Sequence, residues 1–280
     1  MTSVLRPLGR MVVVLALLTA ACGSGGGGDA APGVREQVVS DPTTQDILVF
    51  RPAGGGPWPI VMAYHGSDGD AQQMAELGRR LADAGLLVFA PDVRTDVSTE
   101  QGIVDAANDS ECAYRYARTV ARDFGGGLDL PVTFVGWSFG ANFALQGGLD
   151  EQLDPSRQYI SCFTDVPRPD VVVALSGCHY EFQGRPSTLL DPDEWRNPGA
   201  HLVLAAGADD TVCPAWQSEK LAAALRTRGY AVQHEVLRGA DHFAPVFLAA
   251  GDGGTVPAPQ AAAGDRTVQL ITTAVADDER

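Results

Sequence analysis

The pentapeptide Gly136-Trp137-Ser138-Phe139-Gly140 joins two segments of different character. The apolar run at 130–135 predicts a buried strand before it, and residues 141–146 predict a helix after it. A Gly-x-Ser-x-Gly pattern at such a junction predicts a sharp turn that lifts the serine hydroxyl above the sheet. Chance gives the pattern roughly 0.16 times in a chain of this composition, so the flanking elements carry most of its meaning. Ser138 is therefore the candidate nucleophile.

Short apolar segments alternate with helical patterns along the rest of the chain. Near-continuous apolar strands separated by helices predict an α/β fold, with a mainly parallel sheet covered by helices on both faces. One domain over residues 37–280 accommodates the pattern. Strands are expected at 46–50, 58–64, 86–90, 171–175, 201–206 and 231–237, and helices at 71–84, 101–124, 220–228 and 267–276.

The N-terminal segment has the features of an export signal. Arg6 and Arg10 precede an apolar stretch at 11–18, and small residues lead to Cys22 and a glycine run. The pattern resembles the lipobox of bacterial lipoproteins, although Thr19 stands where the family usually has leucine. The resemblance implies a signal peptide at 1–21, an acylated Cys22 as membrane anchor, and a flexible linker at 22–36. Ordinary cleavage and secretion remains the alternative.

The charge balance bears on the choice of partner. The chain has 35 acidic and 20 basic residues, a formal net charge of −15, and Lys220 is its only lysine. Such acidity argues against a nucleic-acid partner. Contact with a membrane is expected only through the N-terminal lipid, and the oligomeric state stays open.

Four cysteines besides Cys22 form an even set in a chain expected to leave the cytoplasm, which predicts two disulfides. Their spacing contains no Cys-x-x-Cys, so no zinc site is expected. We favour Cys178 with Cys213, because each follows a predicted strand and those strands should be neighbours. This choice leaves Cys112 with Cys162, and the other two pairings remain open.

From Asp46 to the C-terminus the chain resembles the α/β-hydrolase family, and three separated motifs carry the resemblance. The first is the serine pentapeptide. The second, His65-Gly66-Ser67-Asp68-Gly69, is similar to the family's His-Gly-x-x-Gly turn. The resemblance implies that the backbone N–H groups of Ser67 and Phe139 stabilise the oxyanion of a tetrahedral intermediate.

The third motif is a pair of later turns. Residues 207–214 resemble the family's Gly-x-x-Asp turn, which selects Asp210 as the acid with Asp209 as its competitor. Residues 239–243 resemble the Gly-x-x-His turn, which selects His242 as the base. A serine hydroxyl is a weak nucleophile near neutral pH, so an imidazole must accept its proton and a carboxylate must orient that imidazole. The order Ser138, Asp210, His242 is the order this fold uses.

The other histidines and a group of aromatic residues are further candidates for functional roles. His234 and His201 lie in strand patterns and are interpreted as structural, His65 belongs to the oxyanion turn, and His179 follows a strand end where it could line a pocket. The stretch at 178–200 carries Tyr180, Phe182 and Trp195, which either wall a substrate pocket or pack a surface loop.

These features predict a serine esterase, lipid-anchored outside the cytoplasm or secreted, that cleaves a small-molecule or polymeric carboxylic ester through an acyl-enzyme. The chemistry needs neither a metal nor an organic cofactor. Within the family the chain looks most like dienelactone hydrolases and polyester hydrolases, with no large cap domain. The alternatives are a peptidase, a thioesterase or a polysaccharide deacylase on the same fold, and a catalytically silent hydrolase-like binding protein.

Overall fold

The computed structural model describes the chain from residue 34 onward with several gaps. The expected signal peptide, Cys22 and Cys162 lie outside the described residues, and for Phe182 only the backbone is described. Within the described residues, no helix combines the length and apolar character that a membrane span needs. The described ranges are 34–40, 46–67, 69–95, 99–149, 166–182, 185–186, 195, 197–248 and 256–279.

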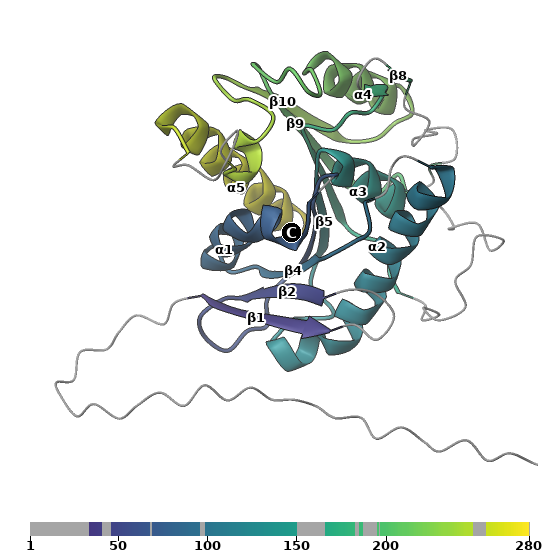
Figure 1. Ribbon diagram of the computed structural model, residues 1–280. Helices are drawn as coiled ribbons and strands as arrows, with labels where there is room; N and C mark the ends of the chain where they lie inside the picture. The colour runs from purple at the N-terminus through teal and green to yellow at the C-terminus, as the bar shows by residue number, and fades with distance from the viewer. Residues whose placement is uncertain are drawn as a thin grey trace, which may run out of the picture. The chain divides into compact units, whose positions relative to one another are not determined.

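An eight-stranded sheet forms the centre of the domain (Figure 1). Its order is β1-β2-β4-β3-β5-β6-β9-β10, in which β1 pairs antiparallel with β2 and β2 antiparallel with β4, while all other pairs are parallel. The strands are β1 (Arg35–Ser40), β2 (Asp46–Arg51), β3 (Ile60–Tyr64), β4 (Leu87–Pro91), β5 (Val132–Trp137), β6 (Val171–Leu175), β9 (His201–Gly207) and β10 (Val232–Leu237). A separate two-stranded sheet joins β7 (Glu181–Phe182) to β8 (Arg185–Pro186).

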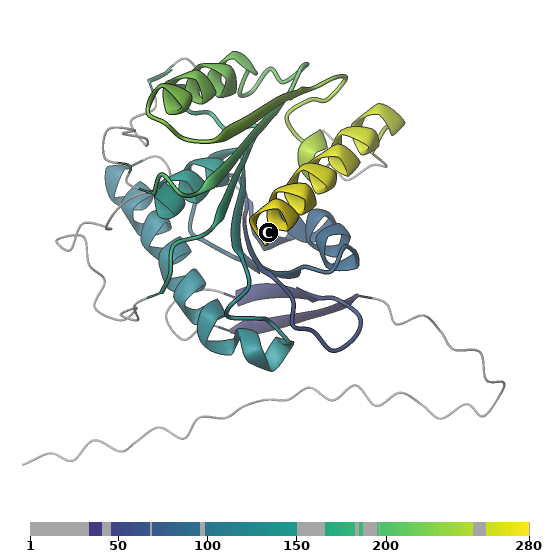
Figure 2. The same cartoon turned by 180° about the vertical axis from the view of Figure 1, so that it is seen from behind.

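Helices cover both faces of the large sheet, as Figures 1 and 2 show from opposite sides. One face carries α1 (Ala75–Asp83) and α5 (Ala258–Asp278), and the other carries α2 (Glu100–Val120), α3 (Phe139–Leu149) and α4 (Trp216–Thr227). Among the described residues there are also three short 3₁₀ segments, η1 (Ala71–Met74), η2 (Ala121–Phe124) and η4 (Ala244–Val246). The mainly parallel, doubly covered sheet predicted from the sequence is confirmed.

Side chains alternate between the two faces because the repeat of a strand is two residues. Val61 and Ala63 of β3 pack toward α1 and α5, whereas Ile60 and Met62 pack toward α2 and α3. The central strands are buried on both faces, which explains their near-continuous apolar sequences.

Strand β1 is part of the large sheet but was not predicted from the sequence. It begins at Arg35, within the segment expected to be a linker, and extends the sheet by pairing with β2. Five of its six residues are exposed, so it lacks the buried apolar pattern by which the other strands are predicted.

The parallel strands all direct their carboxyl ends to one edge of the sheet. The turns after β3, β5, β9 and β10 therefore meet there, and they carry the predicted functional residues. This edge is where an open parallel sheet places its ligands.

Candidate active site

Ser138 occupies the turn between β5 and α3 with a left-handed backbone, φ 56°. A non-glycine residue in this region is strained, and such strain is held only where surrounding contacts enforce it. The Ser138 N–H donates to the carbonyl of Leu175 at 2.9 Å. A Cβ at Gly136 would collide with the Gly140 carbonyl, and one at Gly140 with the Tyr64 carbonyl. Both glycines are thus required for the close passage of the turn.

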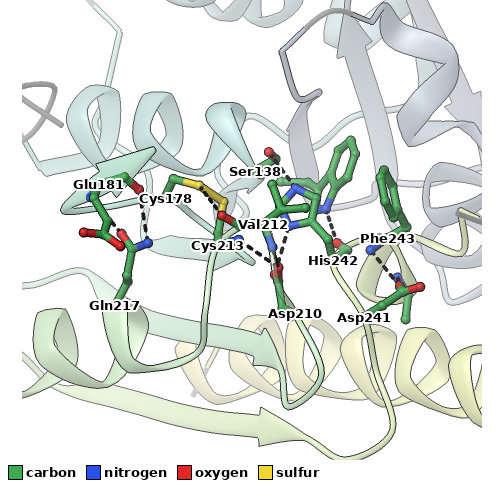
Figure 3. Close-up of polar contacts among 12 residues, drawn as sticks. Ser138, Cys178, Glu181, Asp210, Val212, Cys213, Gln217, Asp241, His242 and Phe243 are labelled. Atoms are coloured by element: carbon green, nitrogen blue, oxygen red, sulfur yellow. Dashed lines mark hydrogen bonds and ion pairs between the residues drawn. A yellow bond between two sulfur atoms is a disulfide. The ribbon is translucent and has the colours of Figure 1, made fainter. Parts of the chain in front are cut away.

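Ser138, His242 and Asp210 form one chain of hydrogen bonds (Figure 3). The Ser138 Oγ lies 2.9 Å from His242 Nε2, and His242 Nδ1 lies 2.9 Å from Asp210 Oδ2. A carboxylate accepts only, so Nδ1 carries the imidazole proton and Nε2 is left to accept the proton of the serine hydroxyl. All three side chains are buried. The geometry suits transfer of the Ser138 proton to His242.

The second Asp210 oxygen is held by the backbone of its own turn. Asp210 Oδ1 accepts the N–H groups of Val212 at 2.9 Å and Cys213 at 2.8 Å. Asp209 is exposed instead, and its backbone N–H donates to the Ala240 carbonyl at 2.9 Å. Of the two candidate acids, the structure brings Asp210 to the imidazole.

Trp137 and Asp241 shape the turn that presents His242. The Trp137 indole N–H donates to the His242 carbonyl at 2.7 Å, and the two rings lie 5.2 Å apart. Asp241 Oδ1 accepts the N–H groups of Phe243 and Ala244, which starts η4. The role of Trp137 was not predicted, since no local sequence pattern links a tryptophan to a carbonyl 105 positions away.

Replacing Trp137 with phenylalanine is expected to lower the free energy of unfolding by about 1–3 kcal/mol, because it leaves a buried carbonyl without its donor. Urea denaturation measures the change. The matched control is Trp216→Phe, since Trp216 is 41% exposed and its replacement should stay within about 0.5 kcal/mol. Equal effects of the two substitutions would contradict the prediction.

The turn after β3 passes directly beside Ser138. A Cβ at Gly66 would lie 3.2 Å from the Ser138 Cβ and 2.8 Å from the Trp137 ring. His65 fixes this turn: its Nδ1–H donates to the Gly66 carbonyl at 2.9 Å, and its Nε2 accepts the Val93 N–H at 3.0 Å. Burial lowers the pKa of His65, which favours the neutral ring that this pair of bonds requires.

The proposed oxyanion donors lie on the two elements that flank Ser138. Phe139 is the first residue of α3, where an N–H has no acceptor within the helix and faces outward at the positive end of the dipole. Ser67 follows Gly66 and is partly exposed. The Gly66 N–H is bonded to Gln73 Oε1 at 3.1 Å, so it is engaged elsewhere. The role of Ser67 and Phe139 as donors stays a prediction.

His179 is buried beside α3 and is not part of the hydrogen-bonded chain. Its Nδ1 lies 3.0 Å from Asn142 Oδ1, and Asn142 sits one turn after Ser138. Burial lowers the pKa of His179 from 6.5 to about 3. The ring is therefore neutral in the folded protein at neutral pH and serves as a hydrogen-bond donor to Asn142.

This burial predicts a loss of stability in acid. Between pH 6.5 and about 3 the unfolded chain binds a proton at His179 that the folded chain does not. The contribution is intact above pH 6.5, and the free energy of unfolding then falls by about 1.4 kcal/mol per pH unit down to the folded pKa. Urea denaturation at several pH values should show a shallower slope for His179→Gln than for the wild type. Identical slopes would contradict the prediction.

Two of the three residues expected to wall a pocket, Tyr180 and Trp195, pack in the same hydrophobic cluster. Tyr180 packs on α4, 6.3 Å from the Trp216 ring and with Lys220 Nζ 4.0 Å from its ring centre. Trp195 is 5% exposed, within the core cluster that also holds Leu221 and Tyr230. The Phe182 side chain lies outside the described residues. A substrate-binding role for the three stays a prediction.

Cys178 and Cys213 form a disulfide, with their Cα atoms 4.8 Å apart. The bond joins the segment after β6 to the turn that carries Asp210, which agrees with the favoured pairing. The second predicted pair, Cys112 with Cys162, cannot be followed because Cys162 is not among the described residues. Within the described part of the chain, no three His, Cys, Asp or Glu side chains gather as a metal site.

Two of the solved structures similar to this one are named as esterases. Thermogutta terrifontis esterase 2 phosphoramylated by tabun matches 89% of this chain and 96% of its own, with a TM-score of 0.63 and 16% identity. The truncated form of a carbohydrate esterase from gut microbiota matches 91% of this chain and 99% of its own, with a TM-score of 0.61 and 15% identity. At these identities the likeness shows the fold, and it confirms the predicted α/β-hydrolase fold.

Among protein sequences, two relatives come from Mycobacterium tuberculosis: uncharacterized protein MT2364 of strain CDC 1551 / Oshkosh and uncharacterized protein Rv2307c of strain ATCC 25618 / H37Rv. Each is 31% identical over 237 residues, which cover 78% of this chain and 75% of the relative. No family model matches the chain. The identity and coverage of these two matches show that the chain belongs to the same family as the mycobacterial protein Rv2307c.

Proposed function

We propose that this protein is a serine esterase that hydrolyses carboxylic esters through an acyl-enzyme. The hydrogen-bonded chain from Ser138 through His242 to Asp210 carries the proposal, because its bonds leave a lone pair of His242 free for the serine proton. The likeness to solved structures titled as esterases supports the choice of ester over other acyl compounds.

In the proposed reaction, Ser138 Oγ attacks the ester carbonyl while His242 Nε2 takes its proton. The imidazolium is stabilised by Asp210, whose second oxygen stays fixed by the Val212 and Cys213 N–H groups. The negative charge that develops on the carbonyl oxygen is received by the N–H groups of Ser67 and Phe139. His242 then gives its proton to the departing alcohol. In the second half of the reaction, water attacks the acyl-enzyme carbonyl while His242 takes its proton, and that proton returns to Ser138 Oγ as the carboxylic acid leaves.

A fluorophosphonate tests this proposal, because it reacts covalently only with an activated serine. Intact mass after exposure should show one adduct on the protein and none on its Ser138→Ala counterpart. A folded protein that acquires no adduct would instead support the silent binding protein.

We propose further that the enzyme acts outside the cytoplasm, held to the membrane by an acylated Cys22. The charged start, short apolar stretch and small residues before Cys22 support this location. The substitution Cys22→Ser should move the protein out of the membrane fraction, and retention there would refute the anchor.

A further inference from the structure

Residues 178–181, called here the bridging segment, follow β6 and lie between the nucleophile helix α3 and the turn of Asp210. Figure 3 shows Cys178 and Glu181 beside Cys213 and Gln217, with Asp210 and Ser138 next to them. Cys178 and His179 are buried, whereas Glu181 is exposed. The segment is therefore placed to link the two halves of the candidate site.

Two hydrogen bonds tie the bridging segment to α3. The Asn142 Nδ2–H donates to the Cys178 carbonyl at 3.4 Å, and the His179 Nδ1–H donates to Asn142 Oδ1 at 3.0 Å. Asn142 is 2% exposed and one helical turn beyond Ser138. One side of the segment thus moves with the helix that begins at the nucleophile.

A covalent bond and three hydrogen bonds tie the other side to the acid turn and α4. Cys178 is disulfide-bonded to Cys213. Gln217, which is fully buried, accepts the N–H groups of Tyr180 and Glu181 at its Oε1, at 2.8 and 3.1 Å. Its Nε2–H donates to the Glu181 carbonyl at 3.1 Å. The Gln217 amide thereby makes the backbone hydrogen bonds that a neighbouring strand would otherwise make.

The disulfide reaches the acid through the backbone of the turn, in which the N–H groups of Val212 and Cys213 both hold Asp210 Oδ1. The Cys213 N–H donates to Asp210 Oδ1 at 2.8 Å, while the opposite oxygen holds His242. A shift of Cys213 would therefore rotate the carboxylate away from the imidazole.

We propose that Cys178, Cys213 and Gln217 are positioning residues that hold the Asp210 carboxylate against His242. This inference rests on the proposed esterase function. None of the three residues is placed to donate a proton or to attack, and their effect passes through the orientation of Asp210. Because Asp210 orients the base and does not bind the substrate, loss of the constraint should lower kcat and leave KM nearly unchanged.

Two variants test the proposal with p-nitrophenyl acetate as substrate. The double variant Cys178→Ala/Cys213→Ala removes the disulfide without leaving a free thiol, and Gln217→Met removes three hydrogen bonds at similar volume. Each is expected to lower kcat about tenfold, with KM within about twofold, since small misplacements of a catalytic group cost about that much or more. If the double variant fails to fold, Gln217→Met carries the test alone.

Tyr114→Phe is the matched control for lost stability. It removes the hydrogen bond from the Tyr114 hydroxyl to the Pro167 carbonyl, 2.6 Å long, on the α2 side of the sheet. This substitution should leave kcat within about twofold, because the lost hydrogen bond ends at Pro167, before β6 and outside both the acid turn and the bridging segment.

The Asp210→Asn background separates positioning from general damage. Once the carboxylate is gone, removing the disulfide or the Gln217 amide should cost no further activity. The inference is overturned if the variants keep full kcat in the wild-type background, or if they lose as much activity in the Asp210→Asn background. Failure of the proposed function is distinguishable, because it would show as no fluorophosphonate adduct on the wild-type protein.

Discussion

Replacing His242 with alanine is expected to lower kcat for p-nitrophenyl acetate by about 10⁶-fold, because the serine proton then has no acceptor. His242 Nε2 lies 2.9 Å from Ser138 Oγ, and no other described histidine is bonded to that hydroxyl. The loss should appear in kcat, since the imidazole acts in the transition state and contributes little to substrate binding. Steady-state assays of ester hydrolysis on the wild type and the variant measure the change in kcat.

His234→Gln is the matched control for this substitution. His234 is half-buried in β10, the strand that leads toward His242, and burial lowers its pKa. Its replacement removes an imidazole from the strand that precedes the His242 turn and leaves the hydrogen-bonded chain intact, so kcat should stay within about twofold. A comparable loss in both variants would show that damage to β10, and not loss of the base, explains the result.

The sequence was sufficient to predict the three residues of the hydrogen-bonded chain because each lies in a local turn after a predicted strand. Ser138 is marked by two glycines that the close packing of the turn requires, and His242 by its place after the last strand. Parallel strands bring such turns to one edge of the sheet, so a linear order of motifs becomes a cluster in space.

Contacts between residues far apart in the sequence have no local pattern that would predict them. Nothing local indicates that the Trp137 indole supports the His242 turn, or that Gln217 pairs with the backbone at 180–181. These bonds depend on how β5, β10 and α4 are placed by the whole fold.

Helix α5 begins at Ala258, earlier than predicted, because its alanine-rich first turns show no strong apolar periodicity.

The choice between Asp209 and Asp210 illustrates the same limit. Both follow Gly207, and a local pattern shifts easily by one residue. The pairing of β9 with β10 decides it: the Ala208 N–H donates to the Leu237 carbonyl and the Asp209 N–H to the Ala240 carbonyl. These bonds fix the turn so that Asp209 points to solvent and Asp210 to the imidazole.

Asp210→Asn is accordingly expected to lower kcat by about 10⁴-fold, whereas Asp209→Asn should leave it within about twofold. The asparagine Oδ1 can keep the N–H groups of Val212 and Cys213, which turns its Nδ2 toward His242. An amide donor there forces His242 Nδ1 to accept, and the imidazole proton moves to Nε2. The ring then faces Ser138 with a proton in place of a lone pair and cannot act as the base.

Steady-state kinetics on the two asparagine variants, which differ by one position and carry the same change of charge, measure this effect. The surface substitution controls for the loss of one negative charge from the turn. Near-equal activities would mean that no single carboxylate orients His242, and a larger loss at Asp209 would place the acid one residue earlier. A selective loss at Asp210 with an unchanged fold would identify Asp210 as the carboxylate that orients His242.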